Sequence, residues 1–239
     1  MPDPPATNPF STRFVRPGSI PYQFSIDRSV DPTSRNPLWS DDPHTTDPCR
    51  RIVHSLLKSG TGTIVGQHGT GKTTLLHTLA NELDIHFDAI EWVQLHAATD
   101  RSFATRLRQY RQNTKHLWHC HARLRKWPGQ SKRQLLIVDG LEQLNGWTRR
   151  RMIQTANRWG HTVLATCHHR IPTMATLFQT ATQSSVIERL TDELIAQSPA
   201  DLQNVIRTEL LRRDLTTVEN VRELWFDLYD LVADFDQAK

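Results

Sequence analysis

Two hydrophobic patterns alternate along the middle of the chain. Short apolar runs without a polar face predict buried β-strands, whereas apolar residues spaced three or four positions apart predict helices that each bury one face. Strands are predicted at 61–65, within 85–95, at 134–139, at 162–166 and, as the last one, at 185–190. Helices are predicted at about 48–59, 73–83, 102–126 and 147–158. Because strands alternate with helices, the pattern predicts an α/β fold with a doubly wound, mainly parallel sheet.

The first of these helices has local signals at both ends. Asp47 is a good N-cap, and Pro48 suits the first helical position because its missing N–H has no partner there in any case. Gly60 favours termination. The ends of this helix are therefore predicted more sharply than those of the others.

The last fifty residues follow a different pattern, which predicts a small helical extension. Helices are expected at 191–197 and at 199–213, the second capped by Ser198, and Thr216 with Glu219 forms a capping box for a third. The third helix carries an apolar seam made of Val218, Val221, Trp225, Leu228, Val232 and Phe235. We expect this seam to dock on the chain's own core, and binding of a partner or a second copy is the alternative.

Proline sets the N-terminal region apart. Ten of the thirteen prolines lie in the first 48 residues, which prevents a continuous helix there. This region also contains aromatic residues through which we expect part of it to pack on the core: Phe10, Phe14, Tyr22, Phe24 and Trp39. The sequence thus predicts a proline-rich arm at 1–46, an α/β domain at 47–190 and a helical extension at 191–239.

Composition excludes several classes of protein. The chain of 239 residues is 37% hydrophobic, and its apolar stretches are far shorter than the roughly 18 residues that a membrane span needs. Its first residues have neither the basic start nor the apolar core of a secretory signal. The three cysteines are too few and too scattered for a disulfide framework. We therefore expect a cytoplasmic protein with reduced thiols and no membrane association.

The most specific segment is 66–73, Gly-Gln-His-Gly-Thr-Gly-Lys-Thr, which fits the pattern G-x-x-x-x-G-K-[ST]. Its glycines let consecutive N–H groups converge on phosphate oxygens, and the helix that follows points its positive end at the same anion. The expected nucleotide-binding residues are Gly66, Gln67, His68, Gly69, Thr70, Gly71, Lys72, Thr73 and Thr74. A glycine-rich turn without a ligand is the alternative, but the position between a predicted strand and a predicted helix favours phosphate binding.

This segment resembles the Walker A loop of the P-loop NTPase superfamily. The resemblance implies a nucleoside triphosphate as the ligand, with Lys72 at the terminal phosphates as a catalytic residue and the Thr73 hydroxyl in the shell of a Mg²⁺ ion. It also implies an apolar strand that ends in an acidic residue near the metal, and 135–139, Leu-Leu-Ile-Val-Asp, fits that description. Asp139 is therefore the second expected metal-site residue, the alternative being an Asp that caps the following turn.

Members of the superfamily that hydrolyse ATP quickly place a Glu directly after this Asp, but Gly140 stands there. Segment 139–143 resembles instead the Asp-Gly-hydrophobic-Asp-Glu form of NACHT and related signalling ATPases, with Gln143 at its final position. The resemblance makes Glu142 the candidate residue that orients water. If Glu142 is only a solvent-facing residue, turnover is slow and the protein acts as a nucleotide-gated switch.

In AAA+-like ATPases, a polar residue at the end of the strand corresponding to 162–166 contacts the γ-phosphate or the attacking water. Thr166 is the catalytic candidate here, with His168 in its place as a second possibility, and a polar loop that touches no nucleotide is the alternative. Arg170 is a weaker candidate for stabilising charge. These features resemble the branch that contains AAA+ and NACHT/STAND ATPases, and the lack of an Asn-Lys-x-Asp box favours ATP over GTP. The chain, including 8–14, is also similar to small uncharacterised bacterial P-loop proteins.

Charge is distributed unevenly. Segment 101–133 has ten Lys and Arg and no Asp or Glu, whereas 188–239 has twelve acidic and six basic residues. The basic segment could bind nucleic acid, with Tyr110, Trp118 and Trp127 available for stacking, or dock to an acidic protein surface. A solvated basic face without a specific role, paired with the acidic helices, is the third interpretation.

The function predicted from the sequence is Mg²⁺-dependent ATP binding with slow hydrolysis to ADP and phosphate. The alternative is a nucleotide-gated module that docks to nucleic acid or to a protein partner. A small-molecule kinase is a weaker hypothesis because no acceptor pocket can be argued from the sequence. The oligomeric state is left open.

Overall fold

The computed structural model describes residues 8–11, 14–24, 47–100, 102–127, 133–218 and 220–237. The chain folds as two compact units. One, the sheet unit, is formed by Ser29–Gly66 and Thr78–Gln179, and the other, the helical unit, by Met1–Arg28, Gln67–His77 and Thr180–Lys239.

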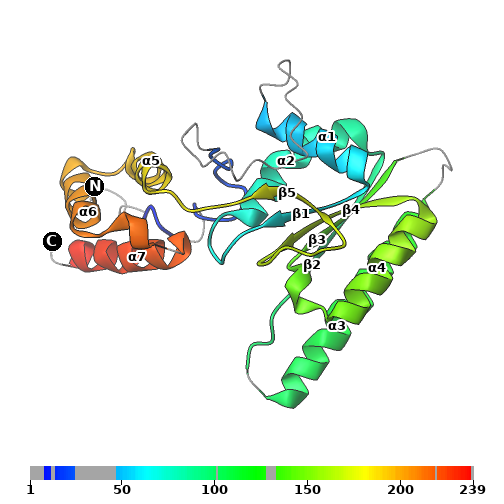
Figure 1. Cartoon of the computed structure of the whole chain (residues 1–239). Coiled ribbons are helices and arrows are strands. Elements are labelled where there is room, and N and C mark those ends of the chain that lie inside the picture. Colours follow the sequence, from blue (N-terminus) through cyan, green and yellow to red (C-terminus); the bar gives the residue numbers. More distant parts are fainter. Residues whose placement is uncertain are drawn as a thin grey trace, which may run out of the picture. The chain divides into compact units, whose positions relative to one another are not determined.

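The sheet unit contains a parallel sheet of five strands in the order β2-β3-β4-β1-β5. The strands are β1 (Thr61–Val65), β2 (Ala89–Gln94), β3 (Gln134–Asp139), β4 (His161–Cys167) and β5 (Ala175–Gln179). Three helices lie wholly within this unit, namely α1 (Pro48–Ser59), α3 (Phe103–Arg125) and α4 (Gly146–Trp159), and residues 78–86 of α2 (Lys72–His86) also belong to it. Helix α1 lies on one face of the sheet, with α3 and α4 on the other (Figure 1). The predicted α/β fold with a doubly wound parallel sheet is confirmed.

The local signals at α1 act as predicted. The Asp47 side chain accepts a hydrogen bond from the backbone N–H of Cys49 at 2.9 Å, and Pro48 occupies the first helical position. Gly60 ends the helix in the left-handed region at φ 70°, where glycine is unstrained, and its N–H donates to the carbonyl of Leu56. Both ends of α1 are therefore specified within the segment itself.

The predicted last strand at 185–190 is wrong, because these residues lie inside helix α5 (Ser184–Ile195). The helix buries Ile187, Thr191 and Ile195, which are spaced by four and so share one helical face. The actual last strand is β5, an edge strand in which only Leu177 is fully buried. Its half-exposed sequence has no apolar run that the pattern could detect.

Tight packing against β5 explains Gly62 in the neighbouring strand β1. A Cβ atom at this position would lie 2.3 Å from Cδ1 of Leu177, closer than any real contact allows. Leu177 is fully buried, so the strand pair has no room to move apart without opening a void. A strand glycine, which is ordinarily unfavourable, is thus required here by a close approach.

Helices α5, α6 (Ala200–Arg212) and α7 (Val221–Gln237), with the short 3-10 helix η3 (Leu215–Thr217), share one hydrophobic core in the helical unit. The seam of the last helix packs into this core, as predicted, with Leu228 and Val232 buried. Phe10 from the N-terminal region is 2% exposed in the same cluster, and the Asn8 side chain donates to the carbonyl of Tyr229 at 2.9 Å. Part of the N-terminal region therefore packs, as expected from its aromatic residues.

Two predicted caps in this unit are wrong. The N-cap of α6 is Pro199, not Ser198, and no side chain caps the helix there. The Thr216 backbone N–H donates to the Asp214 side chain within η3, so Thr216 does not cap the third helix, while Glu219 lies outside the described residues. Asn220 instead precedes α7 and accepts from the backbone N–H of Arg222 at 3.1 Å.

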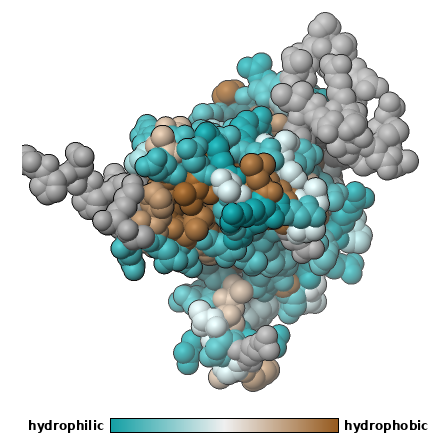
Figure 2. Space-filling model, turned by 90° about the vertical axis from the view of Figure 1, so that its left-hand side faces the viewer, coloured by the Kyte–Doolittle hydropathy of each residue, from teal (hydrophilic) through white to brown (hydrophobic). Residues whose placement is uncertain are grey.

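The surface of the helical unit is not uniformly polar. Leu211 on α6 and Phe226 and Tyr229 on α7 are exposed, and the view in Figure 2 shows hydrophobic side chains, in brown, gathered among hydrophilic ones.

Among the described residues, none of the helices combines the length and the hydrophobicity of a membrane span.

The predicted domain boundaries at 46 and 190 remain predictions. Helix α5 runs across residue 190.

Candidate functional site

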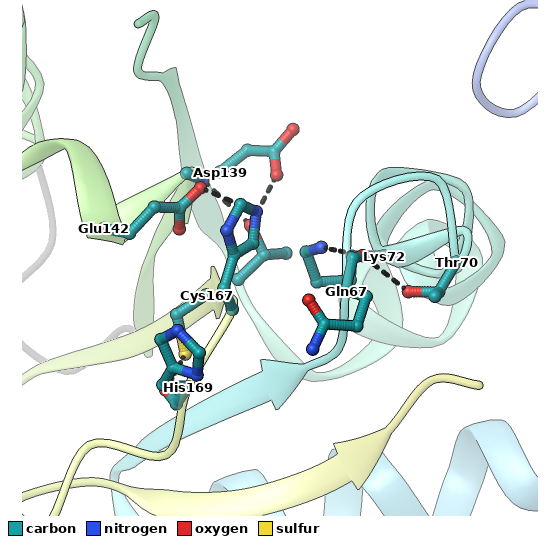
Figure 3. A network of polar contacts seen from close by, with 10 residues as sticks. Gln67, Thr70, Lys72, Asp139, Glu142, Cys167 and His169 are labelled. Carbon is teal, nitrogen blue, oxygen red and sulfur yellow. Dashed lines mark hydrogen bonds and ion pairs between the residues drawn. The ribbon is translucent and has the colours of Figure 1, made fainter. Parts of the chain in front are cut away.

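The glycine-rich segment forms a turn between β1 and α2, where the motif requires it. Gly69 and Gly71 have φ angles of 74° and 86°, in the left-handed region that residues with a Cβ avoid. The Lys72 Nζ atom donates to the carbonyl of Gln67 at 2.7 Å, so the lysine side chain folds back along the loop (Figure 3). The loop thus has the backbone curvature that phosphate binding needs.

The start of α2 supplies the second part of a phosphate site. The Leu75 N–H donates to the carbonyl of Gly71 at 2.8 Å, so helical hydrogen bonding begins directly at the end of the loop. Thr73 and Thr74 lie half-buried in the first turn. The N–H groups in the first turn of a helix point toward its N-terminus, and together with the helix dipole they favour an anion at this point.

Side chains of the helical unit support the loop. The buried Thr70 hydroxyl donates to the carbonyl of Gln67 at 2.9 Å and lies 2.7 Å from the hydroxyl of Thr180. A Cβ atom at Gly69 would lie 1.9 Å from Oδ1 of Asn220, and one at Gly71 would lie 3.1 Å from the ring of Tyr22. The glycines are therefore needed for close packing as well as for conformation.

The loop also borders an open cavity within the helical unit. Its volume is about 480 Å³, and it is lined by Gln67, His68, Arg213, Thr217, Val218, Asn220, Glu223, Leu224 and Asp227. Gln67 and His68 are exposed on the loop, so this side of it is accessible to a ligand. A cavity of this size is in the range that small-molecule ligands occupy.

At the carboxyl end of β3, in the sheet unit, Asp139 is held by a neighbouring strand. The Thr166 hydroxyl, at the end of β4, donates to Oδ1 of Asp139 at 2.5 Å and accepts from the N–H of Gly140 at 2.8 Å. Asp139 is 6% exposed and Thr166 fully buried. Thr166, predicted as a catalytic residue, therefore positions the carboxylate that was predicted to hold the metal.

Gly140 has a structural reason to follow Asp139. Its φ angle is 89°, and a Cβ atom there would lie 2.9 Å from the carbonyl oxygen of Leu95. The Leu95 N–H donates to the carbonyl of Asp139 at 2.8 Å, which holds the two segments together. A Glu directly after Asp139 is incompatible with this backbone, so any water-orienting carboxylate must come from elsewhere.

Glu142 lies in the short 3-10 helix η2 (Leu141–Gln143), directly after this turn. Its Oε1 atom lies 3.3 Å from Nε2 of His168, which follows β4. Its Oε2 atom is buried and has no hydrogen-bond partner among the described residues. Figure 3 shows the Glu142 and Asp139 side chains at the same edge of the sheet. Glu142 is therefore partly desolvated rather than a freely solvated surface group.

Arg170, Cys167 and Gly66 make further contacts near the carboxyl end of β4. Arg170 is exposed and its Nη2 atom donates to the Gln179 side chain at 3.4 Å. Cys167 is buried, and its thiol donates to the carbonyl of His169 at 3.0 Å. The first loop residue, Gly66, is anchored here too, because its N–H donates to the carbonyl of Cys167 at 3.2 Å.

The structure thus brings Asp139 together with Thr166, and Glu142 with His168, in the sheet unit. The loop residues 67–74 belong to the helical unit. Sequence reasoning missed Tyr22, Thr180 and Asn220, because no motif spacing points to them. Burial raises the pKa of Tyr22 to about 12, although a hydrogen bond with the Ala181 backbone opposes the shift, so its hydroxyl stays protonated beside the loop.

Oxygen donors of the kind that Mg²⁺ prefers are present in both units. In the sheet unit, Asp139 provides one buried carboxylate, and in the helical unit, Thr73 provides one hydroxyl. No group of three or more His, Cys, Asp or Glu side chains that could hold a metal ion occurs in the described ranges. Mg²⁺ is commonly bound through one or two protein oxygens, with water and substrate phosphates completing its shell. The chemistry of either donor therefore fits Mg²⁺ that arrives with a nucleotide.

The chain has similar solved structures, but no curated protein matches it. Among solved structures, the replication initiator DnaA bound to AMPPCP and single-stranded DNA is 14% identical with a TM-score of 0.45, and the match covers 76% of this chain and 59% of DnaA. C. elegans PCH-2 is 11% identical with a TM-score of 0.44, and the match covers 77% of this chain and 66% of PCH-2. The chain therefore spans about three fifths of DnaA and two thirds of PCH-2.

The family model of the AAA domain matches residues 46–170, which is more than half of the chain. The matched range contains the loop at 66–73, the strand end at Asp139 and the polar residue Thr166. The resemblance to the P-loop NTPase superfamily is thereby confirmed, whereas the NACHT/STAND branch and the likeness to small bacterial proteins stay predictions. The chain belongs to the AAA domain family.

Proposed function

We propose that this protein binds ATP with Mg²⁺ and hydrolyses it slowly to ADP and phosphate. Membership in the AAA domain family supports nucleotide binding. The observation that carries the proposal is the loop at 66–73, with two glycines at positive φ and Lys72 folded along it at the start of a helix. A loop of this geometry concentrates N–H groups and one ammonium group around a phosphate.

Each residue has a defined role in this proposal. The backbone N–H groups of 66–73 and the Lys72 ammonium hold the phosphates, and the cavity bordered by Gln67 and His68 accepts the nucleoside. Thr73 and Asp139 hold Mg²⁺, which supplies positive charge to the phosphates when it is bound. Thr166 positions Asp139 through the 2.5 Å hydrogen bond and keeps its carboxylate oriented.

The surroundings of Asp139 support slow hydrolysis. No carboxylate can follow it directly because Gly140 has a positive φ and no room for a side chain. Glu142 is the remaining candidate for orienting water, and its Oε1 atom is engaged with His168 at 3.3 Å. Its Oε2 atom has no hydrogen-bond partner among the described residues, so this single oxygen would have to align the water while the His168 contact persists.

Nucleotide titration with purified protein tests the binding part. Lys72→Ala is expected to weaken ATP binding by about 100-fold, because charge-assisted hydrogen bonds to phosphate contribute roughly 1.5–3 kcal/mol each. Lys58→Ala, an exposed lysine at the end of α1, is the matched control and should leave the affinity unchanged. Equal affinity of the wild type and Lys72→Ala would contradict the proposal.

Phosphate release tests the hydrolysis part separately. Asp139→Asn should lose Mg²⁺-stimulated phosphate release, and Glu142→Gln should retain ATP binding but lose turnover. If Glu142→Gln releases phosphate at the wild-type rate, this residue does not orient water. Tight Mg-ATP binding without turnover in the wild type would instead identify a nucleotide-gated switch.

The second candidate function, a nucleotide-gated docking module, is favoured by one observation. Helices α3 and α4 together contain ten Lys and Arg residues and no carboxylate. A binding surface with that charge is compatible with an ATPase that acts on a partner, and the two candidates differ in whether turnover or binding is the output.

A further inference from the structure

The described basic residues gather on two helices that lie side by side in the sheet unit. Helix α3 carries six Lys and Arg, and α4 carries four. The Tyr110 hydroxyl on α3 lies 2.5 Å from the Thr148 hydroxyl on α4, and Arg151 of α4 lies over the ring of Trp118 of α3 at 5.7 Å. The two helices therefore present one continuous surface. Arg101 and 128–132 of the basic segment lie outside the described residues.

Almost none of this charge is neutralised within the described residues. Of the ten cationic side chains on α3 and α4, Arg123 alone has a carboxylate within 4.0 Å there, the Glu91 side chain on β2 at 3.0 Å. Arg108, Arg111 and Lys115 are exposed and are spaced by three and four along α3, so they share one face. Like charges at this spacing repel one another modestly, so an anion that covers this face would stabilise the helix.

An exposed aromatic ring lies within the same surface. Trp147 at the start of α4 is 67% exposed, and the Arg151 guanidinium lies 5.2 Å from its ring centroid. Arg151 is thus packed between an exposed indole of α4 and the Trp118 ring of α3. An indole fixed beside a guanidinium is a surface on which a nucleobase can stack while the cation meets its phosphate.

We propose that the surface formed by Arg108, Arg111, Lys115, Trp147 and Arg151, the basic face, binds single-stranded nucleic acid. Repeated cations match repeated phosphates, which favours a polyanion. The exposed Trp147 favours single strands over duplexes, whose bases are already stacked, and over an acidic protein, which offers no base to stack. The inference does not depend on ATP binding, because none of these residues belongs to the loop at 66–73.

Fluorescence anisotropy with the full chain, without nucleotide, tests the proposal with labelled oligo-dT, oligo-U and a duplex of equal length. Single strands should bind more tightly than the duplex, and the comparison of the two single strands shows whether DNA or RNA is preferred. The substitutions Arg108→Gln, Arg111→Gln and Lys115→Gln combined should weaken binding by about 100-fold near 0.1 M salt. They should also reduce the salt slope by about 2, since each lost phosphate contact removes roughly 0.7 from it.

Two further variants separate charge from stacking. Trp147→Ala should weaken binding by about tenfold without changing the salt slope, because stacking contributes without releasing counterions. A control that removes three exposed cations elsewhere, Lys58→Gln, Arg189→Gln and Arg212→Gln combined, should bind like the wild type. All of these positions are exposed, and circular dichroism should show unchanged helix content.

The results that would overturn the proposal are specific. They are equal binding of the triple basic-face variant and the wild type, equal or tighter binding of the duplex, or an absence of oligonucleotide binding. Displacement of the oligonucleotide by polyglutamate at equal charge would assign the face to an acidic protein instead. Lys72→Ala should bind the oligonucleotide normally, so failure of this inference is distinguishable from failure of the ATP proposal.

Discussion

The sheet unit contains two buried polar sites that are built on opposite principles. At the end of β3, Asp139 and the Gly140 N–H both bond to the Thr166 hydroxyl. Between α3 and the start of β4, His121 and His161 are stacked at 5.6 Å, and both nitrogens of His121 and Nδ1 of His161 have no hydrogen-bond partner among the described residues. The first site holds a carboxylate through hydrogen bonds, whereas the second packs two imidazole rings without hydrogen bonds from the described residues to three of their nitrogens.

Aromatic rings explain how the histidine pair is tolerated. Trp118 stacks on His121 at 5.4 Å, and Trp159 meets it edge-on at 5.6 Å. Burial, and secondarily repulsion from His161, lowers the pKa of His121 to about 4, and burial also lowers the pKa of His161. Arg125 over Trp159 and Arg151 over Trp118 add positive charge around the pair. Both imidazoles are therefore neutral at pH 7 and pack as aromatic groups.

The difference shows how burial selects between a functional and a structural polar site. Burying a carboxylate costs free energy unless hydrogen bonds and a cation compensate for the lost solvation, which is why the hydrogen-bonded site at Asp139 is the one that we propose to bind metal. Burying a neutral imidazole costs less free energy, because contacts with neighbouring aromatic rings compensate in part for the missing hydrogen bonds. Three substitutions test how much each kind of buried polar group contributes to stability.

The largest effect is expected from the histidine pair at low pH. The folded-state pKa of His121 is lowered to about 4, so the folded protein binds this proton less readily than the unfolded chain does. The stabilisation from the neutral ring is therefore fully present above pH 6.5 and is lost as the pH falls from 6.5 toward 4. The loss amounts to about 3 kcal/mol. His121→Phe keeps an aromatic ring and removes the titration, so urea unfolding from pH 7.5 to 4.5 should show a flatter profile for this variant.

A matched control for this variant is His119→Gln. His119 is exposed on the same helix, so its replacement should leave the pH profile unchanged. The comparison fails if His121→Phe retains the full acid sensitivity of the wild type. In that case protonation elsewhere destabilises the fold.

An intermediate effect is expected at the strand end. Thr166→Val has nearly the same shape but removes the hydroxyl, which leaves Oδ1 of Asp139 and the Gly140 N–H without this partner. We expect a loss of about 2 kcal/mol in the free energy of unfolding, and weaker dependence of ATP binding on Mg²⁺. Thr166→Ser restores the hydroxyl and should recover both properties. If Thr166→Val matches the wild type in both, the hydroxyl does not hold Asp139.

The smallest effect is expected at the contact between α3 and α4. Tyr110→Phe removes a hydroxyl that lies 2.5 Å from that of Thr148, which is only 2% exposed. Because Tyr110 is itself half-buried and near solvent, water can replace part of the bond, and we expect a loss of about 1 kcal/mol. Thermal unfolding measures this loss in the free energy of unfolding. If Tyr110→Phe loses as much stability as Thr166→Val, a hydrogen bond near solvent contributes as much as the fully buried one.

Much of the fold and site could be predicted because the signals are local. The caps Asp47 and Gly60, the loop at 66–73 and the apolar run before Asp139 each act within a few consecutive residues. Their physics concerns backbone conformation, helix capping and the burial of a run of side chains, and these follow from neighbours in the sequence.

The errors arose where distant segments decide the outcome. β5 becomes a strand because it pairs with β1, although only one of its side chains is fully buried, and 185–190 becomes a helix because one face meets the helical core. Whether an edge strand pairs, and which face of a helix is buried, depends on the segments packed against it. Tertiary contacts therefore override the local propensity of the sequence.

The glycine-rich loop, the acidic strand end and the basic composition of α3 can be read from the amino-acid sequence alone, since each is a pattern of neighbouring residues. Tertiary packing was needed to show that Thr166 holds Asp139 and that His168 engages Glu142. It was also needed to show that two histidines share a buried aromatic site and that Arg151 of α4 lies over Trp118 of α3. These are contacts between residues far apart in the chain. Their geometry is set by strand register and helix packing, which no local pattern encodes.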